Sequence, residues 1–238
     1  LMLEFIDRIV NMKGMFKKFG DFNSFTEAVD ENKKKELKYI VDKIEKILKG
    51  KYQIDTWGEK IVFDTNKSGH IYLSNASSGQ QEVIRILQDI FLSIAQNTRT
   101  LRIVEEPEAH LFPLAQKDVI ELLVHMANSN KYNQLIITTH SPYVLTILNN
   151  LLFAKRIISH NYKLETDVLK VINKQSLLSI SDFSAYTLEY KEEGIISNSI
   201  IVDNTGMINQ NYLDTVSEIL ANEFNQLYKI HSKTYKRQ

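Results

Sequence analysis

The sequence predicts an α/β fold in which a mostly parallel sheet has helices on its faces. Two short apolar runs, at 101–104 and 134–139, have the length and composition of buried strands. Segments with helical periodicity lie before, between and after these runs. Strands that alternate with helices are joined by crossover connections, so neighbouring strands are expected to run parallel.

Residues 1–50 are predicted to form an N-terminal helical arm. From residue 37 to 48, apolar side chains recur with the spacing of one helix face, and Gly50 stands where a glycine commonly ends a helix. The opposite face is rich in Lys, Glu and Asp, so we expect it to be solvated. Contact with DNA is the alternative for this face, through Lys33, Lys34, Lys35 and Lys38.

Residues 51–175 are expected to form the core domain. The segment 52–73 is rich in β-branched and aromatic residues between turn formers, which predicts a small antiparallel set of strands. The elements expected after it are a helix at 80–95, a strand at 101–104, a helix at 114–128, a strand at 134–139, a helix at 143–152, and strands at 155–159 and 167–172.

Residues 176–238 are predicted to form a C-terminal appendage. The runs FSAYTLEY and IISNSIIVD flank a KEEG turn, a pattern typical of a β-hairpin. Residues 212–230 have the apolar spacing of an amphipathic helix.

The composition excludes several classes of protein. The 29 Lys and Arg residues balance the 29 Asp and Glu residues, which argues against binding to DNA or anionic lipid through bulk charge. The absence of cysteine excludes disulfides and thiolate chemistry and fits a reducing compartment. No apolar run approaches the roughly 20 residues that a membrane span needs. We therefore expect a cytoplasmic protein without a membrane segment.

The first motif with chemical content is SNASSGQQ, at 74–81. It lies where the chain leaves a strand and opens a helix, so it offers free backbone N–H groups, hydroxyls and the positive end of a helix dipole. Those groups suit a phosphate, and a glycine lets a ligand approach the backbone closely. The alternative is an ordinary helix N-cap. The candidate nucleotide-binding residues are Ser77, Ser78, Gly79 and Gln80.

The second motif, LRIVEEPEAHLFP, ends an apolar strand in two adjacent carboxylates, Glu105 and Glu106. Ligands of parallel sheets bind beyond the carboxyl ends of the strands. One carboxylate there can hold Mg²⁺ or its waters while the other orients a water for in-line attack. The alternative is a solvated acidic turn.

The third motif, QLIITTHSP, also runs from an apolar strand into a polar group, His140. A histidine at a strand end can donate a hydrogen bond to a terminal phosphate, although most lone histidines are structural. One helix and one strand separate the acid pair from His140. Two adjacent parallel strands would therefore bring Glu105, Glu106 and His140 to the same edge of the sheet.

These motifs, over residues 70–150, resemble the C-terminal half of an ABC-type ATPase domain of the SMC-like and OLD-like branch, which has a P-loop NTPase-like fold. EEPEAHLFP is similar to the EEPEAHLHP common in that branch and departs only at Phe112. SSGQQ resembles the signature loop, and THSP resembles the switch-histidine loop.

The resemblance implies ATP and Mg²⁺ as ligands. It places Glu105 in the Mg²⁺ shell, at a position where many members of that branch have Asp. It makes Glu106 the residue that activates the attacking water, and it places His140 near the γ-phosphate. It also implies a homodimer that sandwiches two ATP molecules, each capped by Ser77 and Gly79 of the opposite copy.

The phosphate-binding half of such a site is missing from the sequence, because no G-x-x-x-x-G-K-[ST] motif occurs. We expect the chain to be the C-terminal part of a longer protein and to be inactive alone. A P-loop supplied by a separate chain is the less favoured alternative.

The resemblance implies a role in DNA repair, chromosome maintenance or anti-phage defence, with DNA or an effector protein as partner. The rival interpretation is a non-catalytic module that docks an effector such as a nuclease through the arm or the hairpin. Nuclease chemistry on this chain is disfavoured, because IIVDN at Asp203 offers only a lone acid.

Overall fold

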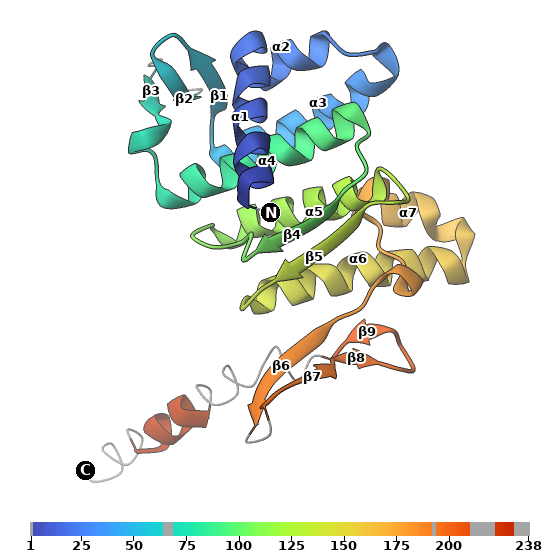
Figure 1. Cartoon of the computed structure of the whole chain (residues 1–238). Helices are drawn as coiled ribbons and strands as arrows, with labels where there is room; N and C mark the ends of the chain where they lie inside the picture. The colour runs from blue at the N-terminus through green and yellow to red at the C-terminus, as the bar shows by residue number, and fades with distance from the viewer. Residues whose placement is uncertain (1, 64–68, 192–193, 210–221, 231–238) are drawn as a thin grey trace, which may run out of the picture. The chain divides into compact units, whose positions relative to one another are not determined.

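The computed structural model describes residues 2–63, 69–191, 194–209 and 222–230. The chain divides into two compact units (Figure 1). Unit 1 comprises residues 1–144 and 172–177, and unit 2 comprises residues 145–171 and 178–238. Each unit is described by itself.

Three helices open unit 1, as predicted for the arm. They are α1 (Met2–Phe19), α2 (Phe22–Glu27) and α3 (Glu31–Leu48). The Asp21 side chain caps α2 by accepting a hydrogen bond from Ser24 N at 2.6 Å. α3 ends where Lys49 takes a left-handed conformation with φ of 54°. The helices enclose a cluster of aromatic rings made by Phe16, Phe22, Phe25, Tyr52 and Phe91.

The predicted antiparallel strands are confirmed. They are β1 (Lys51–Asp55), β2 (Gly58–Phe63) and β3 (Gly69–Tyr72), paired in that order. Asp55 stabilises the β1–β2 turn by accepting hydrogen bonds from Trp57 N and Gly58 N. The small sheet follows α3 directly and leads into the segment that carries the first motif.

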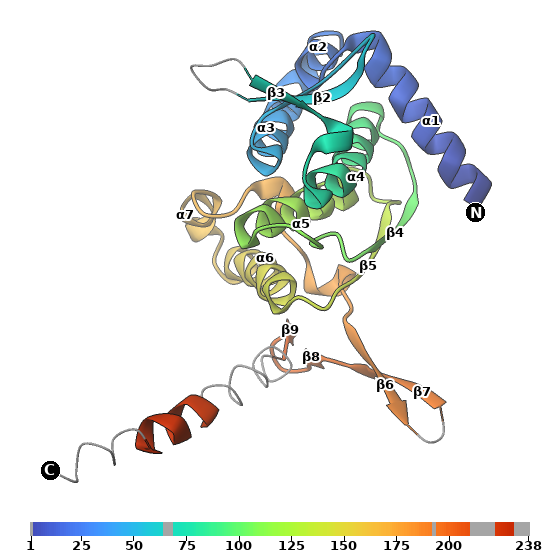
Figure 2. The ribbon, with the colours of Figure 1, turned by 90° about the vertical axis from the view of Figure 1, so that its left-hand side faces the viewer.

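The predicted parallel pair is also confirmed. α4 (Ser78–Gln96) leads to β4 (Leu101–Glu105), and α5 (Pro113–Asn128) leads to β5 (Gln134–Thr138). β4 and β5 pair in parallel register from Leu101↔Gln134 to Glu105↔Thr138. Figure 2 shows α3, α4 and α5 side by side in the same unit, in agreement with their contacts. These helices bury the apolar stripes that the sequence showed.

The expectation that β4 and β5 are buried on both faces is wrong. Arg102 is only 8% exposed, but Leu101 is 58% and Ile103 59% exposed, and Ile136 on β5 is 49% exposed. Side chains alternate between the faces of a strand, so one face of the pair is covered and the other is open. An apolar composition alone cannot show whether another element packs on a given face of a strand.

In unit 2, the predictions after residue 152 need correction. The segments 155–159 and 167–172 were expected to be strands, but α6 spans Pro142–His160 and α7 spans Glu165–Leu169. The buried residues Leu148, Leu151, Leu152 and Ala154 continue a helical stripe toward the first of these segments. A short apolar run cannot be assigned to helix or strand by periodicity alone, and here the helix continued.

The predicted hairpin is present as β6 (Tyr186–Lys191) and β7 (Gly194–Ser199), which pair antiparallel. A smaller pair, β8 (Ile201–Val202) and β9 (Met207–Ile208), follows. The Asn149 side chain on α6 makes the two hydrogen bonds to β9 that a neighbouring strand would make. It donates one to Ile208 O at 3.0 Å and accepts one from Ile208 N at 2.7 Å.

The helix predicted at 212–230 is observed at 222–230, and its first part, to residue 221, lies outside the described residues. A search of the helices in the described parts of the chain finds none long and apolar enough to cross a membrane.

Candidate functional site

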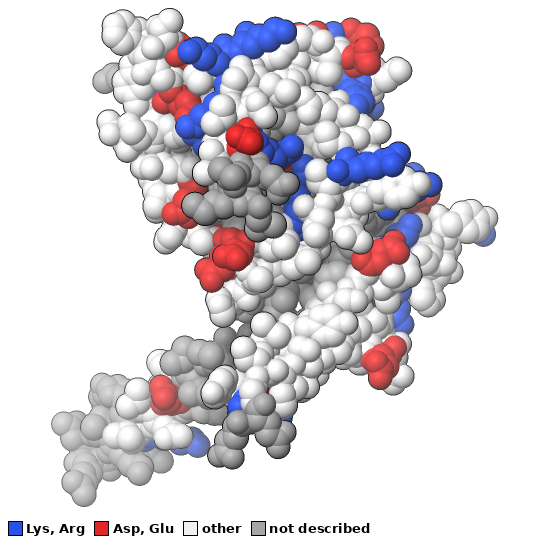
Figure 3. All heavy atoms as spheres, in the orientation of Figure 1, with Lys and Arg blue, Asp and Glu red and all other residues white. Residues whose placement is uncertain are grey.

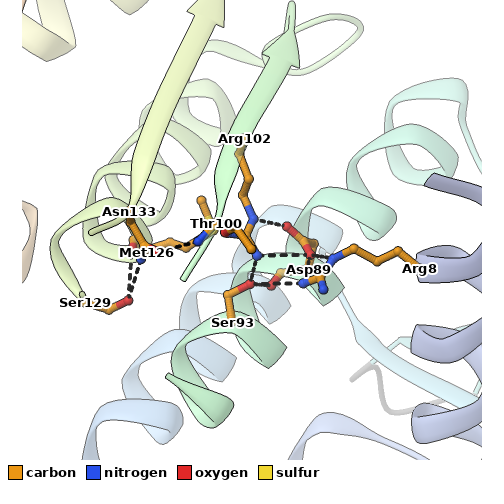
Figure 4. A network of polar contacts seen from close by, with 8 residues as sticks. All are labelled: Arg8, Asp89, Ser93, Thr100, Arg102, Met126, Ser129 and Asn133. Carbon is orange, nitrogen blue, oxygen red and sulfur yellow. Dashed lines mark hydrogen bonds and ion pairs between the residues drawn. The ribbon is translucent and has the colours of Figure 1, made fainter. Parts of the chain in front are cut away.

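The covered face of β4 is tied to two helices by a buried polar network (Figure 4). Arg102 donates hydrogen bonds to Asp89 and Ser93 on α4, and Arg8 on α1 pairs with the same Asp89. Two guanidinium groups thus face one partly buried carboxylate, and their charge-assisted hydrogen bonds compensate its burial. The network fixes the position of β4 against α1 and α4.

A second group of hydrogen bonds fixes where β4 and β5 begin (Figure 4). Asn133, directly before β5, accepts from Thr100 N at 3.1 Å and donates to Met126 O at 2.9 Å. Gln134 N then donates to Thr100 O at 3.0 Å. These contacts set the register of the pair, so the two strands end level with one another.

Because the strands end level, Glu106 and His140 meet at the same edge. Glu106 N donates to Thr138 O at 2.9 Å, which extends the ladder by one bond. The Glu106 carboxylate lies 3.6 Å from His140 Nε2, and both side chains are open to solvent, at 51% and 91% exposure. Glu106 has φ of 41°, a conformation that costs a non-glycine residue free energy and is common at functional sites.

Glu105 is the last residue of β4 and is exposed. Strand alternation places it on the open face, together with Leu101 and Ile103, while Arg102 faces the helices. The structure therefore brings the acid pair and His140 to one edge, with Glu105 on the open face.

The first motif forms a capping box at the start of α4. Ser77 Oγ accepts from Gln80 N at 3.3 Å, and the Gln80 side chain accepts from Ser77 N at 3.2 Å. Gln80 also donates to Leu48 O at 2.7 Å. The N-cap alternative is thus present in the structure, and Ser77 and Ser78 remain exposed to solvent.

Gly79 is buried against the turn that follows the acid pair. A Cβ at this residue would lie 2.4 Å from His110 O, so only glycine fits. His110 Nδ1 also lies 3.1 Å from a Glu82 carboxylate oxygen on α4. The start of α4 is therefore packed on the 106–112 turn, but no hydrogen bond or ion pair described in unit 1 joins Ser77–Gln80 to Glu105, Glu106 or His140.

Sequence reasoning missed the residues that hold the two loops. Glu108 is 6% exposed, and it accepts a hydrogen bond from Thr139 Oγ1, directly before His140. In the sequence, only the position of Glu108 within the acidic turn could have indicated this role, because Glu108 belongs to no helical or strand periodicity.

Two partly buried glutamates elsewhere in unit 1, Glu59 and Glu36, have displaced pKa values. Burial would raise the pKa of Glu59, but hydrogen bonds from Arg85 on α4 and Tyr52 on β1 outweigh it and lower that pKa. The hydrogen bond with buried His125 lowers the pKa of Glu36, against the opposing effect of burial. Both pairs join separate elements of the unit.

The donor set at the strand ends fits Mg²⁺ rather than a metal held by protein alone. The search of the described residues finds no group of three or more His, Cys, Asp or Glu that could hold a metal ion. Mg²⁺ in nucleotide sites commonly uses one or two carboxylates together with substrate phosphates and waters. Glu105, exposed at the end of β4, provides one such carboxylate.

The family model described as the AAA ATPase domain matches residues 11–145. The chain belongs to this AAA ATPase domain family. The match confirms the predicted ATPase resemblance, and every candidate site residue lies within the matched segment. A search of curated proteins finds no match.

Among solved structures, the chain is similar to one from work on the structural biochemistry of ATP-driven dimerization and DNA-stimulated activation of SMC ATPases. The identity is 11% and the TM-score 0.41, over 78% of this chain and 88% of that chain. It is also similar to the Smc head bound to the C-winged helix domain of ScpA, with 11% identity and a TM-score of 0.39. That match covers 77% of this chain and 49% of the other, so this chain spans about half its length.

Proposed function

We propose that this ATPase domain supplies the hydrolytic half of an ATP site in a nucleotide-driven dimerisation switch. The observation that carries the proposal is the meeting of Glu106 and His140, 3.6 Å apart and exposed, at the end of two adjacent parallel strands. An acid and a histidine brought together beyond strand ends suit attack on a terminal phosphate.

The Glu106 carboxylate acts on the attacking water. It accepts a hydrogen bond from the water, orients it in line with the γ-phosphate and withdraws its proton as attack proceeds. His140 donates a hydrogen bond to the γ-phosphate and stabilises the charge that develops there. Both side chains are exposed, so each is open to the ligand.

Glu105 would hold Mg²⁺ or its waters. When bound, the ion neutralises charge on the phosphate oxygens.

Ser77 and Ser78 would cap the nucleotide of a second copy. Gly79 is buried against His110 O and the Gln80 side chain is bonded to Ser77 and Leu48, so these two residues would position the loop. The exposed hydroxyl of Ser78 lies at the N-terminus of α4, which suits a γ-phosphate. The Ser77 hydroxyl is also exposed, and it would exchange its hydrogen bond to Gln80 Oε1 for one to the phosphate. Such contacts exist only while the γ-phosphate is present, so the nucleotide sets the state of the dimer.

The P-loop would come from outside this sequence. The open apolar face of the parallel pair, formed by Leu101, Ile103 and Ile136, supports this part of the proposal. Parallel sheets bury both faces, and the segment that carries a P-loop would cover this one.

For the biological role, we propose DNA repair, chromosome maintenance or anti-phage defence, with DNA or an effector protein as partner. On the face shown in Figure 3, basic and acidic side chains are interspersed. In the arm, Lys33 donates to Ala95 O, and Lys34 and Lys38 pair with Glu27. These pairs favour a solvated arm over direct attraction of the arm to DNA.

A second candidate is an interaction module that acts through the β6–β7 hairpin. One observation favours it: four large side chains stand out from the hairpin, with 63% to 87% of their surfaces exposed. These residues are Tyr186, Leu188, Tyr190 and Ile195. Such a surface can dock an effector whether or not ATP is hydrolysed.

The test uses this chain together with the segment that carries the P-loop. Glu106→Gln should retain ATP and remain a dimer by light scattering, while the wild type returns to monomer as ATP is consumed. Glu31→Gln, an exposed change in the arm, is the matched control and should behave as wild type. The chain alone should show no ATP turnover.

A further inference from the structure

Glu108 is a buried carboxylate outside the set of residues assigned above. It is 6% exposed, and one of its oxygens accepts a hydrogen bond from Thr139 Oγ1. Its other oxygen is buried without a hydrogen-bond partner among the described residues. A buried carboxylate with a single neutral partner costs free energy. Its presence therefore calls for a reason other than stability.

The bond to Thr139 is one link in a closed ring. A carboxylate only accepts, so Thr139 Oγ1 must donate to Glu108, and its lone pair accepts from Ser141 N at 2.9 Å. Ser141 Oγ donates to Gln116 at 3.1 Å, and Gln116 donates to Leu111 O at 3.0 Å. Leu111 N donates to Glu108 O at 3.1 Å, which closes the ring.

The ring joins the two loops that carry the reactive pair. Glu108 stands two residues after Glu106, and Thr139 and Ser141 flank His140 on both sides. Glu106 and His140 themselves project into solvent and take no part in the ring. Two residues of the acidic turn, Glu106 and His110, have positive φ, so this turn needs contacts that hold it.

We propose that Glu108 and Thr139 are positioning residues for ATP hydrolysis, which hold the acidic turn and the histidine loop at the separation that Glu106 and His140 require. This inference rests on the proposed function. A misplacement of about 1 Å can cost a reaction on the order of 100-fold in rate. Loss of the ring should therefore lower kcat and leave the KM for ATP nearly unchanged.

The test measures steady-state ATP hydrolysis by this chain together with its P-loop segment. Thr139→Val keeps the shape of the side chain but removes the hydroxyl, and kcat should fall by at least roughly 10-fold. Thr139→Ser restores the hydroxyl and should recover most of kcat. Glu108→Ala should give a similar loss, and the double variant should be no worse than either single variant, because both changes break the same ring.

Thr26→Val is the matched control. Thr26 is 1% exposed and its hydroxyl donates to Phe22 O at 2.8 Å, so the variant loses a buried hydroxyl far from the strand ends. It should lose similar stability but keep the wild-type kcat. Wild-type kcat in Thr139→Val would overturn the inference.

A measurement on the chain alone tests the ring without hydrolysis. The Ser141 amide should exchange its hydrogen slowly in the wild type and in Thr139→Ser, and faster in Thr139→Val. If Thr139→Val does not fold, Ser141→Ala, which removes only the link to Gln116, should still lower kcat, and an unchanged kcat would overturn the inference. Failure of the proposed function is recognised separately, because Glu106→Gln would then hydrolyse ATP normally.

Discussion

Two of the two-stranded sheets in the described parts of the chain, the parallel pair β4–β5 and the hairpin β6–β7, are similar in length but differ in their surroundings. On β4, Arg102 is 8% exposed and bonded to Asp89 and Ser93 on α4. On β6, Leu188 and Tyr190 are 72% and 87% exposed. The first pair is fixed by contacts between elements, whereas the hairpin depends mainly on its own strand pairing.

This difference matches the roles proposed above for the two regions. Hydrolysis requires that Glu106 and His140 hold one separation, and buried polar networks provide that precision. A docking surface requires exposed apolar area, which the hairpin offers. On this proposal, the positions of Glu106 and His140 are set by residues that lie elsewhere in the two loops and strands.

The largest effect is expected from Asp89→Asn. The change keeps the size of the side chain but leaves Arg102 buried and Arg8 without their carboxylate, and breaking a buried pair costs about 3 kcal/mol of unfolding free energy. Glu189→Gln on the hairpin is the matched control and should stay within about 0.5 kcal/mol of wild type. Urea unfolding measures both, and an equal cost for the two variants would remove the distinction between the regions.

Gly79→Ala should have the next largest effect. Its Cβ would lie 2.4 Å from His110 O, so the turn must shift, at a cost of about 1–3 kcal/mol. The matched control is Gly14→Ala in helix α1, because no atom of another part of the chain lies within 4 Å of the Cβ that this substitution adds. Alanine favours a helix, so this control should stabilise the protein by up to about 1 kcal/mol. Opposite signs in thermal unfolding are expected, and a neutral Gly79→Ala would contradict the packing described.

A smaller effect is expected from pH. The Glu59 pKa is lowered in the folded chain by Arg85 and Tyr52 despite burial. Its contribution to stability is therefore complete above the unfolded pKa, near 4.3. The contribution is lost as the pH falls through the lowered folded pKa. Glu59→Gln should make unfolding free energy less dependent on pH below about pH 4.3, and an unchanged dependence would show that this pair does not stabilise unit 1.

The sequence predicted what depends on local pattern. Polar residues that directly follow apolar strands, at Glu106 and His140, were predicted to meet at one edge, because parallel strands end at the same side of a sheet. The helical arm, the antiparallel strands and the hairpin were likewise predicted from periodicity and turn residues. The limits of the domains and the roles of the site residues stay predictions.

What the sequence did not predict depends on contacts between distant segments. The runs at 155–159 and 167–172 are short, so tertiary context decided their helical conformation. Whether Leu101 and Ile103 are covered depends on the packing of other segments against the strand. The bond between Glu108 and Thr139 joins residues 31 positions apart, and no spacing rule connects them.

The central claim is that Glu106 activates the water that attacks ATP. The most direct measurement is the rate of ATP hydrolysis by Glu106→Gln, in this chain together with the P-loop segment that the proposed function requires, with ATP binding measured in parallel. We expect unchanged binding and a loss of kcat of roughly 100-fold or more, as for the removal of a general base. Normal turnover by Glu106→Gln would contradict the account.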